Sequence, residues 1–331
     1  MPRPHLALLA ALLVAFGLSY FSPQIDPYHL DVLTGVGINI ILAVSLNLVN
    51  GYTGQFSLGH AGFMSVGAYL AAAVSVFLGP SILGTDENSG FVLLFQGLFG
   101  SATGLDAAKG ALFLGALTVG GLSAALAGLV VGVPSLRLRG DYLALVTLGF
   151  GEIIRVIFQN VEVLGGALGL NAIPASTSIF WVLAFVALTL FVVTCLVHST
   201  YGRGFLATHD DEVAAAAVGL NTTRYKIVAF VVGAFFAGVA GGLYGHFKLT
   251  ITPTGFDFTK SIEIVVMVIL GGMGNTIGVI LAAILLTLLP ELLRPIADYR
   301  MIIYSLLLVL LMLLRPQGLF NFKFGRASAA R

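Results

Sequence analysis

Long apolar runs alternate with short polar stretches along most of the chain. A helix needs about 20 mostly apolar residues to cross the hydrocarbon core of a bilayer. Runs that approach or reach this length lie at residues 5–21, 31–49, 61–79, 111–133, 142–158, 179–198 and 227–247. The pattern therefore predicts a series of membrane-spanning helices joined by polar loops.

The first run has some features of a secretory signal, because Arg3 precedes it. However, no small-x-small cleavage site follows it, and a second apolar run begins soon afterwards. A cleaved signal normally carries such a site. We therefore expect residues 5–21 to form a retained membrane helix.

Prolines and polar residues predict where several runs end. Pro80 is expected to close the third run and Pro134 the fourth, because the residue before a proline is disfavoured in the helical conformation. Residues 91–100 are apolar but too few to span a bilayer. We expect a loop with an interfacial piece at 80–110 and a second, glycine-rich loop at 160–178.

The distribution of Lys and Arg sets the expected topology, because these residues concentrate in cytoplasmic loops. Basic residues at 137–139, in 203–226 and after 315 all face inward if the N-terminus is inside and the apolar region 261–290 crosses twice. The sequence GGMGN at 271–275 would then be the bend. With a last span at 301–314, this predicts ten spans; the alternative is eight spans plus a re-entrant pair. The loops expected outside are 80–110, 160–178 and 291–300.

Composition agrees with a polytopic membrane protein. Hydrophobic residues make up 58% of the 331 residues, charged residues only 9%, and the mean hydropathy is +1.02. Soluble domains carry charge on about a quarter of their residues. The net charge of +1 provides no field for nucleic acid. The single cysteine, Cys195, lies in an apolar run and excludes an intramolecular disulfide. We expect an all-α fold in a single domain, 1–331.

The longest polar interruption, 199–226, is predicted to contain a short helix at 209–218 outside the membrane. Thr208 and Asp211 have the spacing of a helix-capping box, and Gly219 suits a left-handed helix end. The body of this helix is four alanines, 214–217, so its flank is nearly bare backbone that another protein could approach closely. No GxxxxGK[ST] phosphate-binding loop occurs in the chain.

Several motifs, in order, resemble one family. They are NLVNGYTGQFSLGHAGFMSVGAYLAA (47–72), LRLRGDYLALVTLGFGEIIR (136–155), the polar stretch at 199–226, ILGGMGNTIG (269–278) and RPQGLF (315–320). Together they resemble the M-type permease subunits of branched-chain amino acid (Liv) importers, which belong to the ATP-binding-cassette class. Two features depart from that pattern: the long segment at 80–109, and Thr208-His209 where a more basic pair is commoner.

The resemblance implies a helical inner-membrane permease that contains no cofactor and catalyses no reaction itself. It further implies a homologous H-type permease, two cytoplasmic ATPase subunits and an extracytoplasmic amino-acid-binding protein as partners, in a lipid membrane. Residues 199–226 then form the coupling loop to the ATPases. The residues expected to make or support this contact are Arg203, Asp211, Glu212, Ala215, Ala216, Gly219 and Arg224.

Two helix breaks are candidates for the substrate pathway, because half-helix ends present free amides and carbonyls to a zwitterion. The candidate residues are Asn47, Gln55, Ser57 and His60 at the first break, and Gly271 and Gly272 at the second. The ten-span topology itself requires both breaks as turns between spans, and we favour this plainer interpretation. The two interpretations remain open.

Small residues follow one face of the seventh run, at Gly233, Ala237, Gly241 and Gly245. Such stripes mark close helix contacts in membranes. The contact could lie within the subunit or across a dimer; we favour the former. Glu152 and Arg155 share another helix face and can neutralise each other, in either a functional or a structural role. No His, Cys or carboxylate cluster has metal-ligand spacing.

Two other classes of function were compared with the permease interpretation. A secondary transporter or channel for a small polar solute fits the composition, but such proteins usually carry buried acidic residues, and only Glu152 and Glu263 come near this. An intramembrane serine protease would need a nucleophile with a histidine partner, and Ser57 near His60 matches that poorly. Dependence of transport on added ATPases distinguishes the permease from both.

Overall fold

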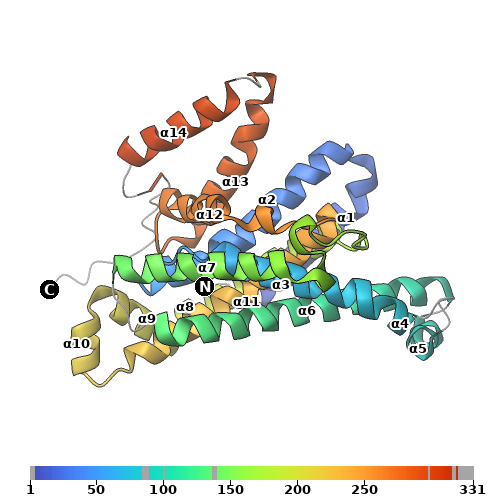
Figure 1. The fold of residues 1–331 in the computed structure, drawn as a ribbon, viewed down its shortest axis with the longest axis horizontal. Coiled ribbons are helices and arrows are strands. Elements are labelled where there is room, and N and C mark those ends of the chain that lie inside the picture. Colours follow the sequence, from blue (N-terminus) through green and yellow to red (C-terminus); the bar gives the residue numbers. More distant parts are fainter. Residues whose placement is uncertain are drawn as a thin grey trace.

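The computed structural model describes residues 4–83, 89–99, 101–135, 140–296, 299–314 and 318–319. Over these residues the chain is helical and contains no β-strand; one isolated bridge joins Leu170 to Ile251 (Figure 1). The predicted all-α fold is confirmed.

Most of the described residues belong to α-helices. These are α1 (Pro4–Phe21), α2 (Pro27–Asn47), α3 (His60–Ala73), α4 (Gly79–Leu83), α5 (Gly90–Phe99), α6 (Ser101–Ser135), α7 (Asp141–Asn160), α8 (Ile179–His198), α9 (Thr200–Asp210), α10 (Glu212–Ala217), α11 (Thr222–Lys248), α12 (Phe258–Gly271), α13 (Thr276–Leu292) and α14 (Arg300–Leu314). Two π-helical turns extend α2 and α3, at Leu48–Tyr52 and Val74–Leu78. Short 3-10 helices lie at Ser22–Gln24, Glu162–Leu164, Gly166–Leu168, Pro253–Phe256 and Arg294–Ile296.

Six helical stretches are long and apolar enough to cross a membrane, counting only the described residues. They cover 27–52, 60–83, 105–135, 142–160, 179–198 and 222–248. Shorter apolar helices occur at 8–21, 276–292 and 302–311. The predicted break at 271–275 is confirmed, because α12 ends at Gly271 and α13 begins at Thr276.

The expectation that Pro80 ends the third helix is wrong. The helix passes through the π-helical turn Val74–Leu78, in which Gly79 N–H bonds to Val74 O, and continues as α4 to Leu83. Pro80 then lies in the first turn of α4, where a missing N–H costs little. Pro134 likewise lies one residue inside the end of α6. Within the segment 80–110, expected to be a loop with an interfacial piece, the described residues belong almost entirely to α4, α5 and the beginning of α6; residues 84–88 and 100 lie outside the described residues.

Helix α11 is at the centre of the packing, with α3 and α6 against it. Gly67 of α3 lies against the backbone of Gly238, and Gly241 against the carbonyl of Met64. A side chain at either glycine would collide with backbone, so these close approaches need glycine. Figure 1 shows α9 and α10 at one end of the long axis and α4 and α5 at the other. The polar loop at 199–226 and the helices α4 and α5 therefore lie at opposite ends of the bundle.

Candidate functional site

The polar loop at 199–226, expected from the sequence to be a coupling loop, contains two helices that meet at Asp211. Asp211 Oδ1 accepts hydrogen bonds from the N–H groups of Val213 (2.8 Å) and Ala214 (3.0 Å), and so caps α10. The capping box predicted for Thr208 is wrong, because Thr208 is buried inside α9 and its Oγ1 donates to Gly204 O at 2.8 Å. The predicted single helix at 209–218 is therefore the end of α9, a corner and α10.

The end of α10 has the left-handed conformation that the sequence predicts. Gly219 has a φ of 87°, and its N–H bonds to Ala216 O at 3.0 Å. Leu220 N–H bonds to Ala215 O at 3.1 Å. This pair of bonds is the Schellman arrangement, which satisfies the last carbonyls of the helix. The short helix is thus fixed at both ends.

The exposed side of α10 is apolar. Val213 and Val218 are 64% and 78% exposed, and the exposed alanines between them are Ala214, Ala216 and Ala217. We call these five residues the α10 face. Ala215, which was expected to approach a partner, instead points into the protein and is only 4% exposed. An apolar surface with such small side chains allows close contact with another protein.

Glu212 ties α10 to α11 rather than forming an exposed charged rim. Its Oε1 lies 2.8 Å from Lys226 Nζ and accepts a 3.4 Å hydrogen bond from Thr222 Oγ1. Lys226 is buried, so this ion pair has little competition from solvent. Arg203, Asp211 and Arg224 are exposed. The ion pair and the hydrogen bond therefore connect α10 to the beginning of α11.

Helix α9 also touches the loop that follows the break in α2. A Cβ at Gly54, whose φ is 68°, would lie 2.9 Å from His209 Cδ2. Phe205 of α9 is buried and packs edge-on against Tyr225 of α11, with ring centroids 6.0 Å apart. A displacement of α9 would therefore reach both α11 and the loop next to Gln55.

The two predicted helix breaks meet in the structure. Asn47 Oδ1 accepts a hydrogen bond from Gly274 N at 2.9 Å, and the hydroxyls of Tyr52 and Thr276 are 2.8 Å apart. Gly271 and Gly272 belong to the same turn, and Leu319 N–H bonds to Leu270 O at 2.8 Å. From the sequence, the two breaks were independent candidates. In the fold they are in direct contact.

The remaining residues of the first break lie in a buried polar loop. Ser57 N–H bonds to Asn50 Oδ1 at 3.2 Å, and His60 Nε2 is 2.9 Å from Ser45 Oγ. The side-chain amide of Gln55 is buried and has no hydrogen-bond partner among the described residues, and the same holds for Asn47 Nδ2. Buried polar atoms normally have partners. These amides therefore mark the loop as a site where polar groups remain available.

The stripe on α11 contacts α2 and α3 of the same chain. A Cβ at Gly233 would lie 3.1 Å from Ser45 O, and one at Gly245 would lie 3.7 Å from Ala68 O. Gly241 lies against Met64 O, and Ala237 is fully buried. All these neighbours belong to this chain.

Glu152 and Arg155 form the predicted ion pair on α7, with Arg155 Nε donating to Glu152 Oε2 at 2.7 Å. Both side chains are partly exposed, at 36% and 25%. No cluster of three metal-ligating side chains occurs within the described ranges.

A polar cleft that sequence reasoning missed lies at the other end of α2, α11 and α13. It has a volume of about 170 Å³ and includes Asp31, Asn39, Lys248, Lys260, Thr287 and Glu291. From the sequence only Glu263 was considered, and it does not line the cleft itself but pairs with Lys260. The other partners come from distant helices, so spacing could not reveal them.

The bundle of long apolar helices, with a capped apolar helix outside them, defines a polytopic membrane protein with a surface suited to a partner protein. Comparison with protein families matches residues 28–314 to the family described as "Branched-chain amino acid transport system / permease component". The chain belongs to this family.

Individual relatives agree with this assignment. LivM of Salmonella typhimurium (strain LT2), a high-affinity branched-chain amino acid transport system permease protein, is 35% identical over 352 residues, covering 96% of this chain and 75% of LivM. LivH of Escherichia coli (strain K12), a permease protein of the same kind of system, is 25% identical over 84% of this chain and 90% of LivH. LsrC of Photorhabdus luminescens, an autoinducer 2 import system permease protein, is 29% identical over 84% of this chain and 78% of LsrC. No solved structure gives a significant match.

Proposed function

We propose that this chain is one of two membrane-spanning subunits of an ATP-driven importer for branched-chain or related amino acids, in the inner membrane. The family and the LivM similarity support the transport role. The observation that carries the mechanism is the α10 face, an exposed apolar surface on a helix fixed at both ends.

The α10 face is the proposed contact with an ATPase subunit. Small side chains let backbones approach closely, and exposed charges are available on the neighbouring segments, at Arg203 of α9, at Asp211 and at Arg224 of α11. Rim charges mainly affect association rate and salt dependence. The hydrogen bonds at Gly219 and Leu220 fix the end of α10, and the ion pair of Glu212 with Lys226 links α10 to α11. A movement of the ATPases would displace α10, and the contacts of α9 and α11 would transmit this displacement to the helix breaks.

The proposed topology has ten spans, with α12 and α13 crossing as a short pair around the turn at 272–275. The contact of this turn with the break in α2 supports a common, cytoplasmic position for both. Residues 199–226 are on the same side. The short lengths of α12, α13 and α14 leave the re-entrant pair as the alternative.

The meeting of the two breaks is the proposed inner part of the substrate pathway. Asn47, Gln55 and Ser57 offer amide and hydroxyl groups there, and the turn containing Gly271 and Gly272 offers backbone groups. His60 is held by Ser45 and would act by positioning the loop. These groups can meet a zwitterion without a buried charge.

The proposed assembly has this chain beside an H-type permease, with two ATPases inside and an amino-acid-binding protein outside. The test is uptake of labelled leucine, isoleucine and valine by proteoliposomes that contain the purified complex. We expect uptake to require ATP on the ATPase side and liganded binding protein on the other. Uptake by this chain without ATPases, driven by an ion gradient, would instead establish a secondary transporter.

The choice of solute is tested by the same assay. LsrC shows that a relative can belong to a system named for a different solute. A panel should therefore include autoinducer 2 beside the amino acids. Preference for it over all branched-chain amino acids would overturn the proposed substrate while leaving the permease role intact.

A further inference from the structure

The cleft near Lys260 combines two kinds of surface. Part of its lining is charged or polar and comes from four helices, with Asp31, Asn39, Lys248, Lys260, Thr287 and Glu291. The remaining lining is mostly apolar and includes Val32, Ile38, Met64 and Phe247. Small-molecule sites typically combine an apolar lining with a few placed polar groups.

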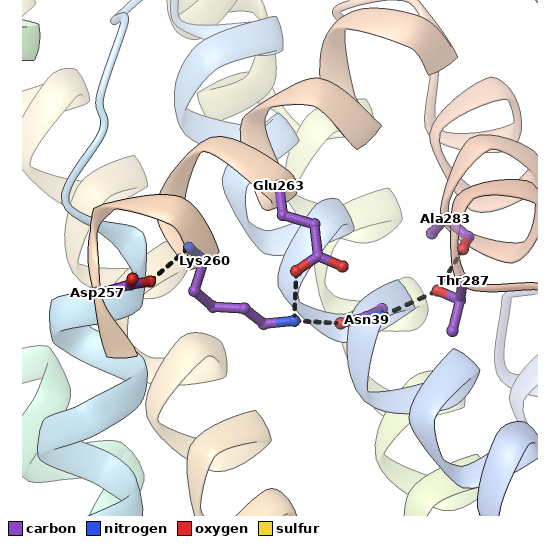
Figure 2. Close-up of polar contacts among 6 residues, drawn as sticks. All are labelled: Asn39, Asp257, Lys260, Glu263, Ala283 and Thr287. Atoms are coloured by element: carbon purple, nitrogen blue, oxygen red, sulfur yellow. Dashed lines mark hydrogen bonds and ion pairs between the residues drawn. The ribbon is translucent and has the colours of Figure 1, made fainter. Parts of the chain in front are cut away.

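Lys260 is positioned at the cleft by three neighbours, as Figure 2 shows. Its backbone N–H bonds to Asp257 Oδ1 at 3.0 Å, which starts α12. Its Nζ donates to Glu263 Oε2 at 2.9 Å and to Asn39 Oδ1 at 3.4 Å. An ammonium has three N–H donors. These two bonds therefore leave one N–H with which Lys260 can bind a ligand in the cleft.

A chain of hydrogen bonds fixes the orientation of Asn39 (Figure 2). Thr287 Oγ1 donates to Ala283 O at 2.7 Å, so it accepts from Asn39 Nδ2 at 2.9 Å. The amide oxygen of Asn39 must then face Lys260. Asn39 is only 8% exposed, so this arrangement is held inside the protein. The ammonium is thus oriented by two helices other than its own.

Two carboxylates also line the cleft. Asp31 Oδ1 is 3.2 Å from Lys248 Nζ, and Glu291 Oε2 accepts from Tyr28 OH at 2.6 Å. The lining thus contains two ammonium and two carboxylate groups. Groups of both signs suit a zwitterion better than a simple anion or a simple cation.

The cleft is at the opposite end of its helices from the coupling loop. Lys248 ends α11, whereas Thr222 at its beginning adjoins α10. Asp31 is near the beginning of α2, whereas Asn47 at its end contacts the turn before α13. In the proposed topology the cleft therefore opens outward.

We infer that this cleft is the entry subsite for the amino acid, with Lys260 binding the α-carboxylate, Asp31 or Glu291 the α-ammonium, and the apolar lining residues the side chain. The inference rests on the proposed function for its choice of ligand. It assigns this subunit a direct role in admitting the solute, upstream of the helix breaks.

The test measures ligand binding to the purified complex without binding protein, by saturation-transfer NMR with L-leucine, isoamylamine and 4-methylpentanoate. Each analogue lacks one of the charged groups of leucine. We expect leucine to give the strongest transfer. In Lys260→Met, apparent affinity for leucine should fall about tenfold or more, since a hydrogen bond to a charged group is lost. Lys260→Arg should retain most of it.

The variant Glu263→Gln tests whether Lys260 matters because it binds the ligand or only because it forms an ion pair with Glu263. This change removes the negative charge of the pair but keeps a side-chain oxygen that can still accept from Lys260 Nζ, so the ammonium stays in position, and Glu263 does not line the cleft. We expect leucine affinity within about twofold of the native complex. Lys109→Met, on an exposed part of α6, is the matched control for losing a lysine. Equal losses in Glu263→Gln and Lys260→Met, or no loss in either, would overturn the entry subsite.

Uptake distinguishes this failure from failure of the proposed function. If the native complex imports leucine with ATP but Lys260→Met imports it as well and binds it as tightly, the subsite is wrong and the function stands. If the native complex imports no branched-chain amino acid, the proposed substrate is wrong, and leucine binding still decides the subsite. If Lys260→Met does not assemble, Lys260→Gln and the analogue series supply the same comparison.

Discussion

The two ends of α2 and α11 differ in the groups that they present. At the coupling end, the exposed surface of α10 is apolar and the nearby charged pair, Glu212 with Lys226, is turned inward. At the other end, the ammonium of Lys260 and the carboxylates of Asp31 and Glu291 line an open cleft. A surface of the first kind suits a folded protein, and one of the second kind suits a small charged solute.

This difference indicates how one chain can connect a partner on one side with a solute on the other. The helices are continuous between the ends except at the breaks beside Asn47 and Gly274, where they touch. Elsewhere α11 packs closely on its neighbours through glycines, which leaves little room for one helix to shift against another. Movement is therefore expected to concentrate at the breaks.

The largest expected effect comes from filling the α10 face. Ala216→Trp should reduce stimulation of ATP hydrolysis by liganded binding protein by about tenfold or more, the factor for ~1.4 kcal/mol of lost contact. The ring would hold the ATPase away from the exposed backbone, while the permease itself should keep its melting temperature. Ala215→Trp is the contrasting variant: Ala215 is buried, so this change should destabilise the permease. Full stimulation in Ala216→Trp would mean that the face is not the contact.

Among substitutions that add one methyl group to α11, Gly241→Ala should lower the stability of the protein most. Its Cβ would meet the backbone carbonyl of Met64, and overpacking of this kind costs about 1–3 kcal/mol. Gly115→Ala in α6 is the matched control, because nothing lies within 4 Å of its Cβ position. Thermal unfolding of both variants in detergent checks the difference. Equal melting temperatures would show that the close contact with α3 is absent.

Glu212→Gln should destabilise the coupling loop by about 2 kcal/mol, because it leaves the buried ammonium of Lys226 without its carboxylate. The double variant Glu212→Gln/Lys226→Met should recover much of that loss, since no unpaired charge remains. Proteolysis of the loop, with the melting temperature, measures both. A double variant less stable than Glu212→Gln alone would argue against the ion pair.

Asp211→Ala should have the smallest effect, about 1 kcal/mol of α10 stability, the usual value of a helix cap. It should weaken coupling only partly, because the Schellman end at Gly219 remains. Hydrogen exchange at the amides of Val213 and Ala214, which bond to Asp211, gives the direct readout. Unchanged exchange there would exclude the capping role.

Local pattern predicted most helix bodies. The run at 179–198 corresponds to α8, and the glycines at 271–275 to the turn between α12 and α13. Both predictions depend only on apolar length and on residues that break helices. Gly219 was predicted for the same reason, because a left-handed helix end is a local property.

Predictions that depended on three-dimensional neighbours were less successful. Thr208 and Asp211 have the spacing of a capping box, but Thr208 lies inside α9 and so cannot begin the next helix. The π-helical turn before Pro80 has no simple sequence signal, so the continuation into α4 was missed. Glu212 and Lys260 have partners on other helices, at Lys226 and Asn39. Sequence could identify these charges but not the groups that they face.

The most direct test of the account is the side of the membrane on which each end lies. In a Cys195→Ser background, Asp31→Cys and Ala216→Cys place single cysteines at exposed positions in the cleft and on the α10 face. Intact cells are treated with a membrane-impermeant maleimide. We expect rapid labelling at position 31. We expect labelling at position 216 only after permeabilisation. Rapid external labelling at position 216 would contradict it, because the α10 face could not then meet a cytoplasmic ATPase.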